Sequence, residues 1–281
     1  MLKQYQLRNY RIRLIIYVLL LTCIGIAVIG SARESVQNKQ VAGLCLGLFA
    51  MIVVSLIDYS FILKFSWLIY IFNIGLLLSI YVIGDDSNGS TRWIEIAGIR
   101  FQPSELAKIL LILFFAYFFM KHQENLNTVK ILGASAFLVG VPLILILEQP
   151  DLSTTIVTTL IFIALLFIAG LSYKIILGAL VISVPSALVF LSLILQPDQK
   201  ILDPYQYKRI MGWLNPEKYS DTAYQQLNSI MAIGSGQLWG KGLNTTDVAS
   251  VKNGNFISEP QTDFIFAVAG EELGFVGAAL I

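Results

Sequence analysis

Apolar residues occur along this chain in long runs that are separated by short polar breaks. A helix needs roughly 20 apolar residues to cross about 30 Å of hydrocarbon, and most of these runs reach that length. The pattern therefore predicts an all-α polytopic membrane protein, with one membrane domain over residues 1–281. The predicted spans, about eight in number, lie near 12–31, 40–57, 61–83, 104–121, 130–148, 151–170, 173–196 and 263–281.

Basic residues beside the spans predict an orientation. If the N-terminus is inside, the inner segments hold Lys3, Arg8, Arg11, Arg13, Lys64, Lys121, Lys130 and Lys174, and the short outer loops hold Arg33, Lys39, Arg92 and Arg100. This excess of inner Lys and Arg predicts a cytoplasmic N-terminus. The outer side then receives most of the acidic residues, so we expect the polar function to face outward.

A polar segment at 197–262 is too long to be a simple connection between spans. Leu227, Ile230 and Met231 recur in it at helical spacing, and its Tyr and Trp residues suit the headgroup level. We therefore expect a large extracellular loop with interfacial helices. Its glycines at 234, 236, 240 and 242 mark tight turns or a close approach of the backbone to a ligand.

Composition removes several classes of function. Hydrophobic residues make up 56% of the chain and the net charge is +1, so no basic field is available for nucleic acid. His122 is the only histidine, which is too few for a His-based metal site or a Ser-His-Asp triad. Cys23 and Cys45 lie inside apolar runs, as is typical of cysteines that act as small hydrophobic residues.

Asp263 is the most informative single residue, because it stands where the long loop meets the last apolar run. It can cap the helix that follows, or it can take part in chemistry. A carboxylate that is partly desolvated at that depth is a better general base than an exposed one, which suits proton abstraction from a sugar hydroxyl. Glu271 and Glu272 follow about two turns later, and at least one of them must face protein or water.

Other ionisable residues are candidates for the same outer face. Glu105 and Lys108 share a helix face at the mouth of the fourth span, where they form a site or a self-neutralising pair. Arg92 suits a pyrophosphate or headgroup anchoring. Asp151 follows a proline and can cap the sixth span or join a site. Lys241 lies in a glycine-rich segment whose spacing does not match a P-loop. We expect its charge either to contact a phosphate or to stay in solvent.

Six motifs occur in order along nearly the whole chain. They are Gly-Ser-Thr-Arg-Trp-Ile (89–94), Gln-Pro-Ser-Glu-Leu-Ala-Lys (102–108), Gln-Pro-Asp-Leu-Ser-Thr (149–154), Ala-Ile-Gly-Ser-Gly (232–236), Gly-Lys-Gly (240–242) and the segment 259–274 around Thr-Asp-Phe-Ile-Phe. With them the chain resembles the SEDS family of RodA, FtsW and SpoVE proteins, and the wording at 89–94 and 149–154 favours a RodA-like member. Members of that family have ten spans, so the resemblance implies a C-terminally truncated sequence.

The resemblance implies a peptidoglycan glycosyltransferase that polymerises lipid II at the outer face of the bacterial cytoplasmic membrane. It also implies a class B penicillin-binding protein as partner. Asp263 matches the essential extracellular Asp of the family, and Glu105 and Lys108 match its functional Glu and Lys. We expect the site to be a groove between these two groups.

Our mechanistic hypothesis is inverting transfer, in which Asp263 activates the acceptor 4-hydroxyl and undecaprenyl pyrophosphate leaves. Lys108, Arg92, Arg209 or a divalent cation such as Mg²⁺ then stabilises the charge of the leaving group. Two alternatives stay open. A lipid II flippase or transporter would need a polar route through the inner half of the bilayer, for which Asn73, Thr158 and their neighbours are the candidates. A non-enzymatic scaffold would only recruit a penicillin-binding protein.

Overall fold

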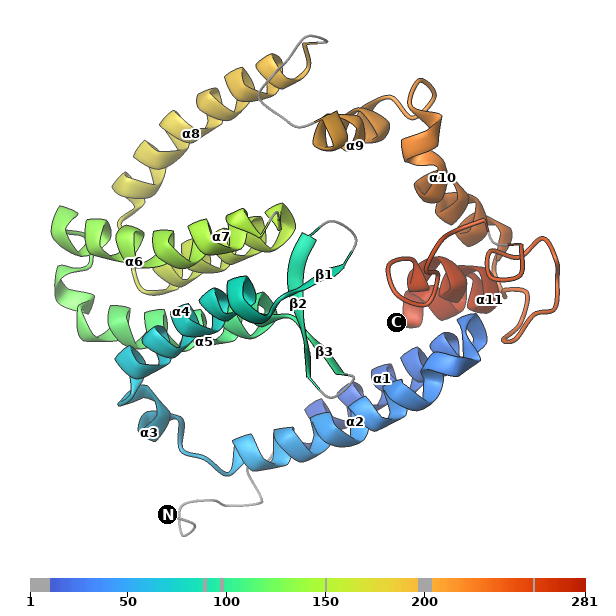
Figure 1. The fold of residues 1–281 in the computed structure, drawn as a ribbon, viewed down its shortest axis with the longest axis horizontal. Helices are drawn as coiled ribbons and strands as arrows, with labels where there is room; N and C mark the ends of the chain where they lie inside the picture. The colour runs from blue at the N-terminus through green and yellow to red at the C-terminus, as the bar shows by residue number, and fades with distance from the viewer. Residues whose placement is uncertain (1–10, 88–89, 97–98, 150, 197–203, 255) are drawn as a thin grey trace. The chain divides into compact units, whose positions relative to one another are not determined.

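The structure is a computed structural model that describes residues 11–281 apart from 88–89, 97–98, 150, 197–203 and 255 (Figure 1). The chain divides into two compact units. Unit 1 comprises Met1–Leu56 and Val189–Ile281, and unit 2 comprises Ile57–Leu188. Both units are built from helices, as the hydrophobic pattern predicts, and we describe each by itself.

Unit 2 is a helical bundle in which α5 is the most deeply packed helix. Its elements in chain order are α3 (Tyr59–Leu63), α4 (Ser66–Ile83), β1 (Asp85–Ser87), β2 (Ser90–Ile96), β3 (Ile99–Phe101), α5 (Pro103–Lys121), η3 (Gln123–Asn125), α6 (Val129–Glu148), α7 (Leu152–Ile168) and the first part of α8 (Tyr173–Ile194). α5 packs against both α4 and α7. Pro103 in its first turn and Lys121 in its last suit the geometry and the dipole of a helix.

Aromatic side chains from α5 form the core of unit 2. Phe114 and Phe115 are almost completely buried, with ring centroids 5.1 Å apart, and Phe115 meets Phe162 of α7 edge to face at 5.0 Å. The hydroxyl of Tyr70 on α4 donates to the carbonyl of Leu138 on α6 at 2.8 Å. Because lipid tails are as apolar as these side chains, this close packing and hydrogen bonding, rather than burial from water, holds the helices together.

A small antiparallel sheet joins α4 to α5, where the sequence analysis predicted only a loop. The strand order is β1-β2-β3, with Ile94 opposite Phe101 and Glu95 opposite Arg100. Strand β2 packs against both α4 and α5. The sheet is too short to leave a clear alternating pattern in the sequence, and it brings Arg92 close to the start of α5.

Unit 1 contains α1 (Ile12–Ala32) and α2 (Glu34–Ser55), which pack against each other with Arg33 between them. It also contains the end of α8 and the helices α9 (Pro204–Leu214), α10 (Ser220–Ser235) and α11 (Ile265–Leu280). α10 packs along α11, and α11 contacts α1. A small core of Val28, Ala232, Val251, Ile257, Ala267, Val268 and Ala269 joins these helices to the loop after α10.

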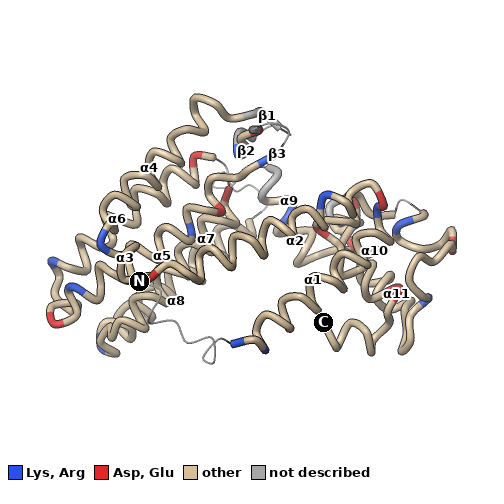
Figure 2. The backbone as a smooth tube through the Cα atoms, turned by 90° about the horizontal axis from the view of Figure 1, so that it is seen from below, with Lys and Arg blue, Asp and Glu red and all other residues tan. Residues whose placement is uncertain are grey.

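In the described part of the chain, six helices are long and apolar enough to cross a membrane, namely α1, α2, α4, α5, α6 and α8. α7 is apolar but slightly shorter, at 17 residues. The predicted span at 61–83 is divided into α3 and α4 by a turn at Lys64. α4 contains no charged residue, and those of α6 and α8 lie at or near the helix ends (Figure 2). These findings confirm a polytopic membrane fold.

The eighth predicted span, 263–281, is not one continuous helix. Within α11, Gly274 has φ 66° and ψ −170°, a conformation that only glycine adopts without strain. The backbone therefore breaks there, and the apolar run contains two short helical pieces. The sequence pattern could not show this break, because its cause is a second segment that inserts at Gly274.

Candidate catalytic site

Asp263 belongs to the turns that precede α11, and its side chain is exposed. The cap position of α11 is occupied by Phe264, without a side-chain cap, so the predicted capping by Asp263 is wrong. The cause is local: the turn that ends with Thr262 N–H bonded to Glu259 O delays the helix until Ile265, which leaves Asp263 outside it. Its exposure is to the surroundings of the protein, and the partial desolvation expected at that depth stays a prediction. Within the described residues, Asp263 makes no hydrogen bond or ion pair.

The glycine-rich segment 236–242 inserts into the break of α11. The N–H groups of Lys241 and Gly242 donate to the carbonyls of Glu271 and Glu272, each at 2.9 Å. In return, the N–H groups of residues 275 and 276 donate to the carbonyls of residues 237 and 238, at 2.7 and 3.1 Å. Backbone groups that the break frees are thus paired again, as a low-dielectric environment requires.

Close approach explains the glycine at position 240. Gly240 has φ 76°, and a Cβ there would collide with the carbonyl of Glu272. The sequence analysis offered tight turns or a close ligand as reasons for these glycines. At Gly240 the close neighbour is the protein's own backbone.

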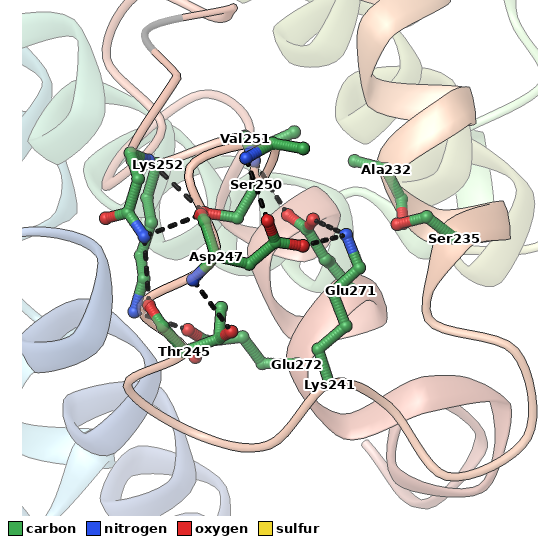
Figure 3. A network of polar contacts seen from close by, with 12 residues as sticks. Ala232, Ser235, Lys241, Thr245, Asp247, Ser250, Val251, Lys252, Glu271 and Glu272 are labelled. Atoms are coloured by element: carbon green, nitrogen blue, oxygen red, sulfur yellow. Dashed lines mark hydrogen bonds and ion pairs between the residues drawn. The ribbon is translucent and has the colours of Figure 1, made fainter.

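Glu271 and Glu272 lie at this break and are almost completely buried, at 2% and 1% exposure. Lys241 Nζ lies 2.7 Å from Glu271 Oε1, and Lys252 Nζ lies 2.6 Å from Glu272 Oε1 (Figure 3). The other oxygen of Glu271 accepts from the backbone N–H of Val251 at 2.9 Å. Both acids therefore face protein, as the cost of charge in lipid demands.

Further polar groups complete this network. Lys241 Nζ is also 3.5 Å from Asp247 Oδ2. The hydrogen bond with Glu271 is the main reason that the pKa of Lys241 is raised above its ordinary value, so the lysine stays charged. Ser31, near the end of α1, donates to Glu272 at 2.6 Å and accepts from Lys252 Nζ at 2.8 Å. This pairing of Lys241 favours a structural role over its predicted contact with a phosphate.

Sequence reasoning missed Lys252 and Ser31. The available signal was the pair of adjacent acids inside an apolar run, which requires cationic partners somewhere in the chain. Their identity depends on contacts across 20 residues for Lys252 and across 241 residues for Ser31.

In unit 2, Glu105 and Lys108 lie in the first turns of α5, as predicted. Lys108 Nζ lies 2.8 Å from Glu105 Oε1, and the Glu105 side chain is 57% exposed whereas that of Lys108 is 20% exposed. The two residues therefore form the expected (i, i+3) pair. An ion pair at this spacing contributes only about 0.2–0.5 kcal/mol to helix stability, so stability is a weak reason for its presence.

Asp151 is the N-cap of α7, which confirms the predicted capping. Its Oδ1 accepts from Thr154 N–H at 3.0 Å, and its Oδ2 accepts from the Thr154 hydroxyl at 2.8 Å. Oδ2 also accepts from Gln102 Nε2 at 2.9 Å, and Gln102 stands at the cap position of α5. One buried carboxylate thus links the starts of two helices, and Gln102 is a further residue that the sequence analysis did not select.

Arg92 lies on β2, partly buried beside the helix ends of unit 2. Its Nε atom is buried and has no hydrogen-bond partner among the described residues. Arg209 lies exposed on α9 of unit 1. No group of three or more His, Cys, Asp or Glu side chains in the described part of the chain could hold a metal ion, so we assign no metal site.

The candidates thus fall in both units. Asp263, Arg209 and Lys241 belong to unit 1, whereas Arg92, Glu105, Lys108 and Asp151 belong to unit 2. The groove that the sequence analysis expects between Asp263 and the mouth of α5 stays a prediction.

Comparison with known proteins shows the family. The family model FtsW/RodA/SpoVE, described as "Cell cycle protein", matches residues 9–281. The chain belongs to this family. The resemblance found in the motifs is therefore confirmed.

Several curated relatives in the family are similar in sequence. The chain is 34% identical over 248 residues to the probable peptidoglycan glycosyltransferase FtsW of Buchnera aphidicola subsp. Baizongia pistaciae, with 87% of this chain and 61% of the relative covered. It is 36% identical over 226 residues to the protein of the same name from Acinetobacter baylyi, with 76% and 50% covered. The peptidoglycan glycosyltransferase MrdB of Escherichia coli K12 is 35% identical over 248 residues, with 87% and 64% covered. The chain thus spans 50% to 64% of these relatives.

Solved structures of family members have the same fold. A chain from a peptidoglycan synthase complex, studied for its coordination of polymerization and crosslinking, superposes with a TM-score of 0.71 at 25% identity. That match covers 96% of this chain and 73% of the other. The rod shape determining protein RodA of Thermus thermophilus superposes with a TM-score of 0.61 at 22% identity, covering 96% and 70%. Since the relatives bear both FtsW and MrdB names, the predicted RodA-like role stays a prediction.

Proposed function

We propose that the protein is a peptidoglycan glycosyltransferase that polymerises lipid II at the outer face of a bacterial cytoplasmic membrane, with its N-terminus in the cytoplasm. The observation that supports this most is the contrast among the acids near α11. Glu271 and Glu272 are buried and paired, whereas Asp263 is exposed and makes no hydrogen bond or ion pair within the described residues. A carboxylate in that state is available to a substrate. The names of the curated relatives support the same reaction class.

In the proposed reaction, Asp263 accepts the proton of the 4-hydroxyl of the acceptor GlcNAc. The oxygen attacks the anomeric carbon of the donor MurNAc from the face opposite the leaving group, so the configuration inverts. As the new glycosidic bond forms, the bond between the anomeric carbon and the pyrophosphate oxygen breaks. Its electron pair leaves with undecaprenyl pyrophosphate, and the proton stays on Asp263.

Cations are required where the pyrophosphate charge develops. Arg92 is one candidate, because its partly buried side chain has no ion-pair partner among the described residues. Lys108 can contribute a second charge, and its exposed partner Glu105 can move away to release it. Arg209, or a divalent cation such as Mg²⁺, is a further candidate for the same task.

Two further observations bear on the alternatives. The threonines that a polar transport route would use are already engaged, because the hydroxyls of Thr155, Thr158 and Thr159 donate to carbonyls one turn back in the same helix. This favours an enzyme over a flippase. The structural relative in a peptidoglycan synthase complex supports assembly with a crosslinking enzyme, and we propose a class B penicillin-binding protein as that partner.

The test is polymerisation of lipid II by the purified protein in liposomes, read as glycan strands on a gel. We expect Asp263→Asn to abolish polymer at unchanged protein level. Asp221→Asn is a matched control, because Asp221 is also exposed and lies in the same extended loop region. Normal polymer from Asp263→Asn would contradict the proposal and would favour a scaffold.

A further inference from the structure

Two lysines from the loop after α10 meet two adjacent carboxylates at the break of α11 (Figure 3). Lys252 and Glu272 are 8% and 1% exposed in their side chains, so this pair is deeply buried. A buried ion pair costs desolvation energy that an apolar pair of similar volume would avoid. Stability is therefore a weak explanation for the buried pair of Lys252 and Glu272, whereas its geometry joins the loop to the helix.

The network fixes three points of one loop on one helix. Lys241 is held to residue 271 both by its backbone N–H and by its side chain. Val251 N–H binds the other oxygen of Glu271, and Lys252 binds Glu272. The loop between them is closed by Asn253, whose side-chain amide donates to the carbonyls of residues 245 and 247 at 3.0 and 2.9 Å. The loop is thereby attached to α11 up to residue 253.

Asp263 lies in the segment that follows directly. Residues 253–254 and 256–264 lie between the attached point beside Glu272 and the start of the same helix at Ile265. Residues 265 and 272 are roughly 10 Å apart along an α-helix, so the two ends of this segment lie close together. Its middle is packed on α10, where Ile257 is buried and Asn228 donates to the carbonyl of Phe256 at 2.9 Å. Both ends of the segment that contains Asp263 are therefore set by α11.

We propose that Glu271, Glu272, Lys241 and Lys252 are positioning residues for Asp263. The two ion pairs hold the loop in one register on α11, and this register sets where the exposed carboxylate meets the acceptor hydroxyl. Ser31 adds α1 to the arrangement, because its hydroxyl contacts both Glu272 and Lys252. The inference rests on the proposed function, since it concerns the carboxylate that the proposed reaction uses.

The principal test is the double variant Lys252→Met/Glu272→Gln. It removes both charges together, so that no unpaired charge is left buried. Glutamine keeps the shape of the side chain, and its carbonyl oxygen can still accept from the Ser31 hydroxyl. Since a displacement of about 1 Å can lower a rate about 100-fold, we expect kcat for lipid II polymerisation to fall about 10- to 100-fold, with KM within about twofold.

A second measurement reports the position itself. Spin labels at Thr262 and Met231, both exposed and both in unit 1, give a distance across α10 and the Asp263 segment. The labels are placed in a background in which Cys23 and Cys45 are replaced by Ala. We expect a narrow distance distribution in the parent protein and a broad one in the double variant. The single variant Lys252→Arg keeps a positive charge beside Glu272. We expect it to retain a narrow distribution and most of kcat.

Lys39→Met is the control, because it removes an exposed charge on α2 of the same unit, away from the loop and from the segment that contains Asp263. We expect it to leave kcat within about twofold. An unchanged kcat and a narrow distribution in the double variant would overturn the inference, and so would a broad distribution with unchanged kcat. These outcomes are separate from failure of the proposed function, in which Asp263→Asn itself retains polymerisation.

Discussion

The hydrogen bond between Gln102 and Asp151 joins the starts of α5 and α7, and the substitutions Asp151→Asn and Gln102→Glu test its contribution. In Asp151→Asn, Oδ1 can still accept from Thr154 N–H, but the new amide faces the amide of Gln102. The Gln102 amide must then turn over so that its carbonyl oxygen accepts from the new amide, and a neutral hydrogen bond replaces one to a charged group. In Gln102→Glu, two carboxylates oppose each other instead.

The size of the effect follows from the contacts. A hydrogen bond to a charged group contributes about 1.5–3 kcal/mol, and loss of an N-cap costs about 1 kcal/mol. We expect Asp151→Asn to lose about 2 kcal/mol, because it loses the first contribution and keeps most of the second. Asp151→Ala should lose about 3 kcal/mol, because it loses both.

The double variant Asp151→Asn/Gln102→Glu restores one donor and one charged acceptor. The carboxylate introduced at position 102 can accept from the amide introduced at position 151 and from the hydroxyl of Ser104, which Gln102 contacts at 2.9 Å. We therefore expect a favourable coupling of at least about 1 kcal/mol between the two substitutions. Glu124→Gln, on an exposed residue of η3, is the control and should change stability by less than about 0.5 kcal/mol.

Thermal unfolding in detergent measures these differences. At about 2–4 °C per kcal/mol, Asp151→Asn should melt roughly 4–8 °C below the parent protein. Strictly additive losses in the double variant would refute the reasoning. Polymerisation by the double variant separates two roles: restored stability with restored activity assigns Asp151 to the cap, whereas restored stability without activity assigns its carboxylate to the chemistry.

Two further predictions concern the break in α11. Gly274→Ala should lower the melting temperature by several degrees, because a side chain at φ 66° costs about 1–3 kcal/mol and would meet the backbone of Gly240. Gly43→Ala is the control and should not lower it, because the space around Gly43 is open. Lys241→Met leaves the carboxylate of Glu271 unpaired and should melt below the parent protein. Because the pKa of Lys241 is raised in the folded state by Glu271 and Asp247, the stabilisation is fully present at neutral pH and is lost as pH rises through the folded pKa. The difference in melting temperature should therefore stay constant to about pH 9 and shrink above about pH 10, and a difference independent of pH through that range would argue against the ion pair.

The sequence predicts much of this fold because the length of an apolar run is set by the bilayer, which acts on each segment separately. The capping by Asp151 and the pairing of Glu105 with Lys108 were also predictable, since both depend on spacings of three residues. The interruption at Gly274, the partners of Glu271 and Glu272 and the exposure of Asp263 were not predictable. Each of them depends on where the loop after α10 meets α11, and nothing in the local sequence of either segment specifies that contact.

The interrupted backbone of α11 also makes the shape of this helix depend on the loop that docks on it. The carbonyls of residues 271 and 272 and the N–H groups of residues 275 and 276 find their partners in residues 237–242. In hydrocarbon, each of these groups would cost several kcal/mol if it were left alone. Without the loop, the same four groups would pair with one another in a continuous helix, because residues 275 and 276 lie four positions after residues 271 and 272. The broken form of α11 therefore exists only while the loop is docked, so undocking of the loop and straightening of α11 are one event.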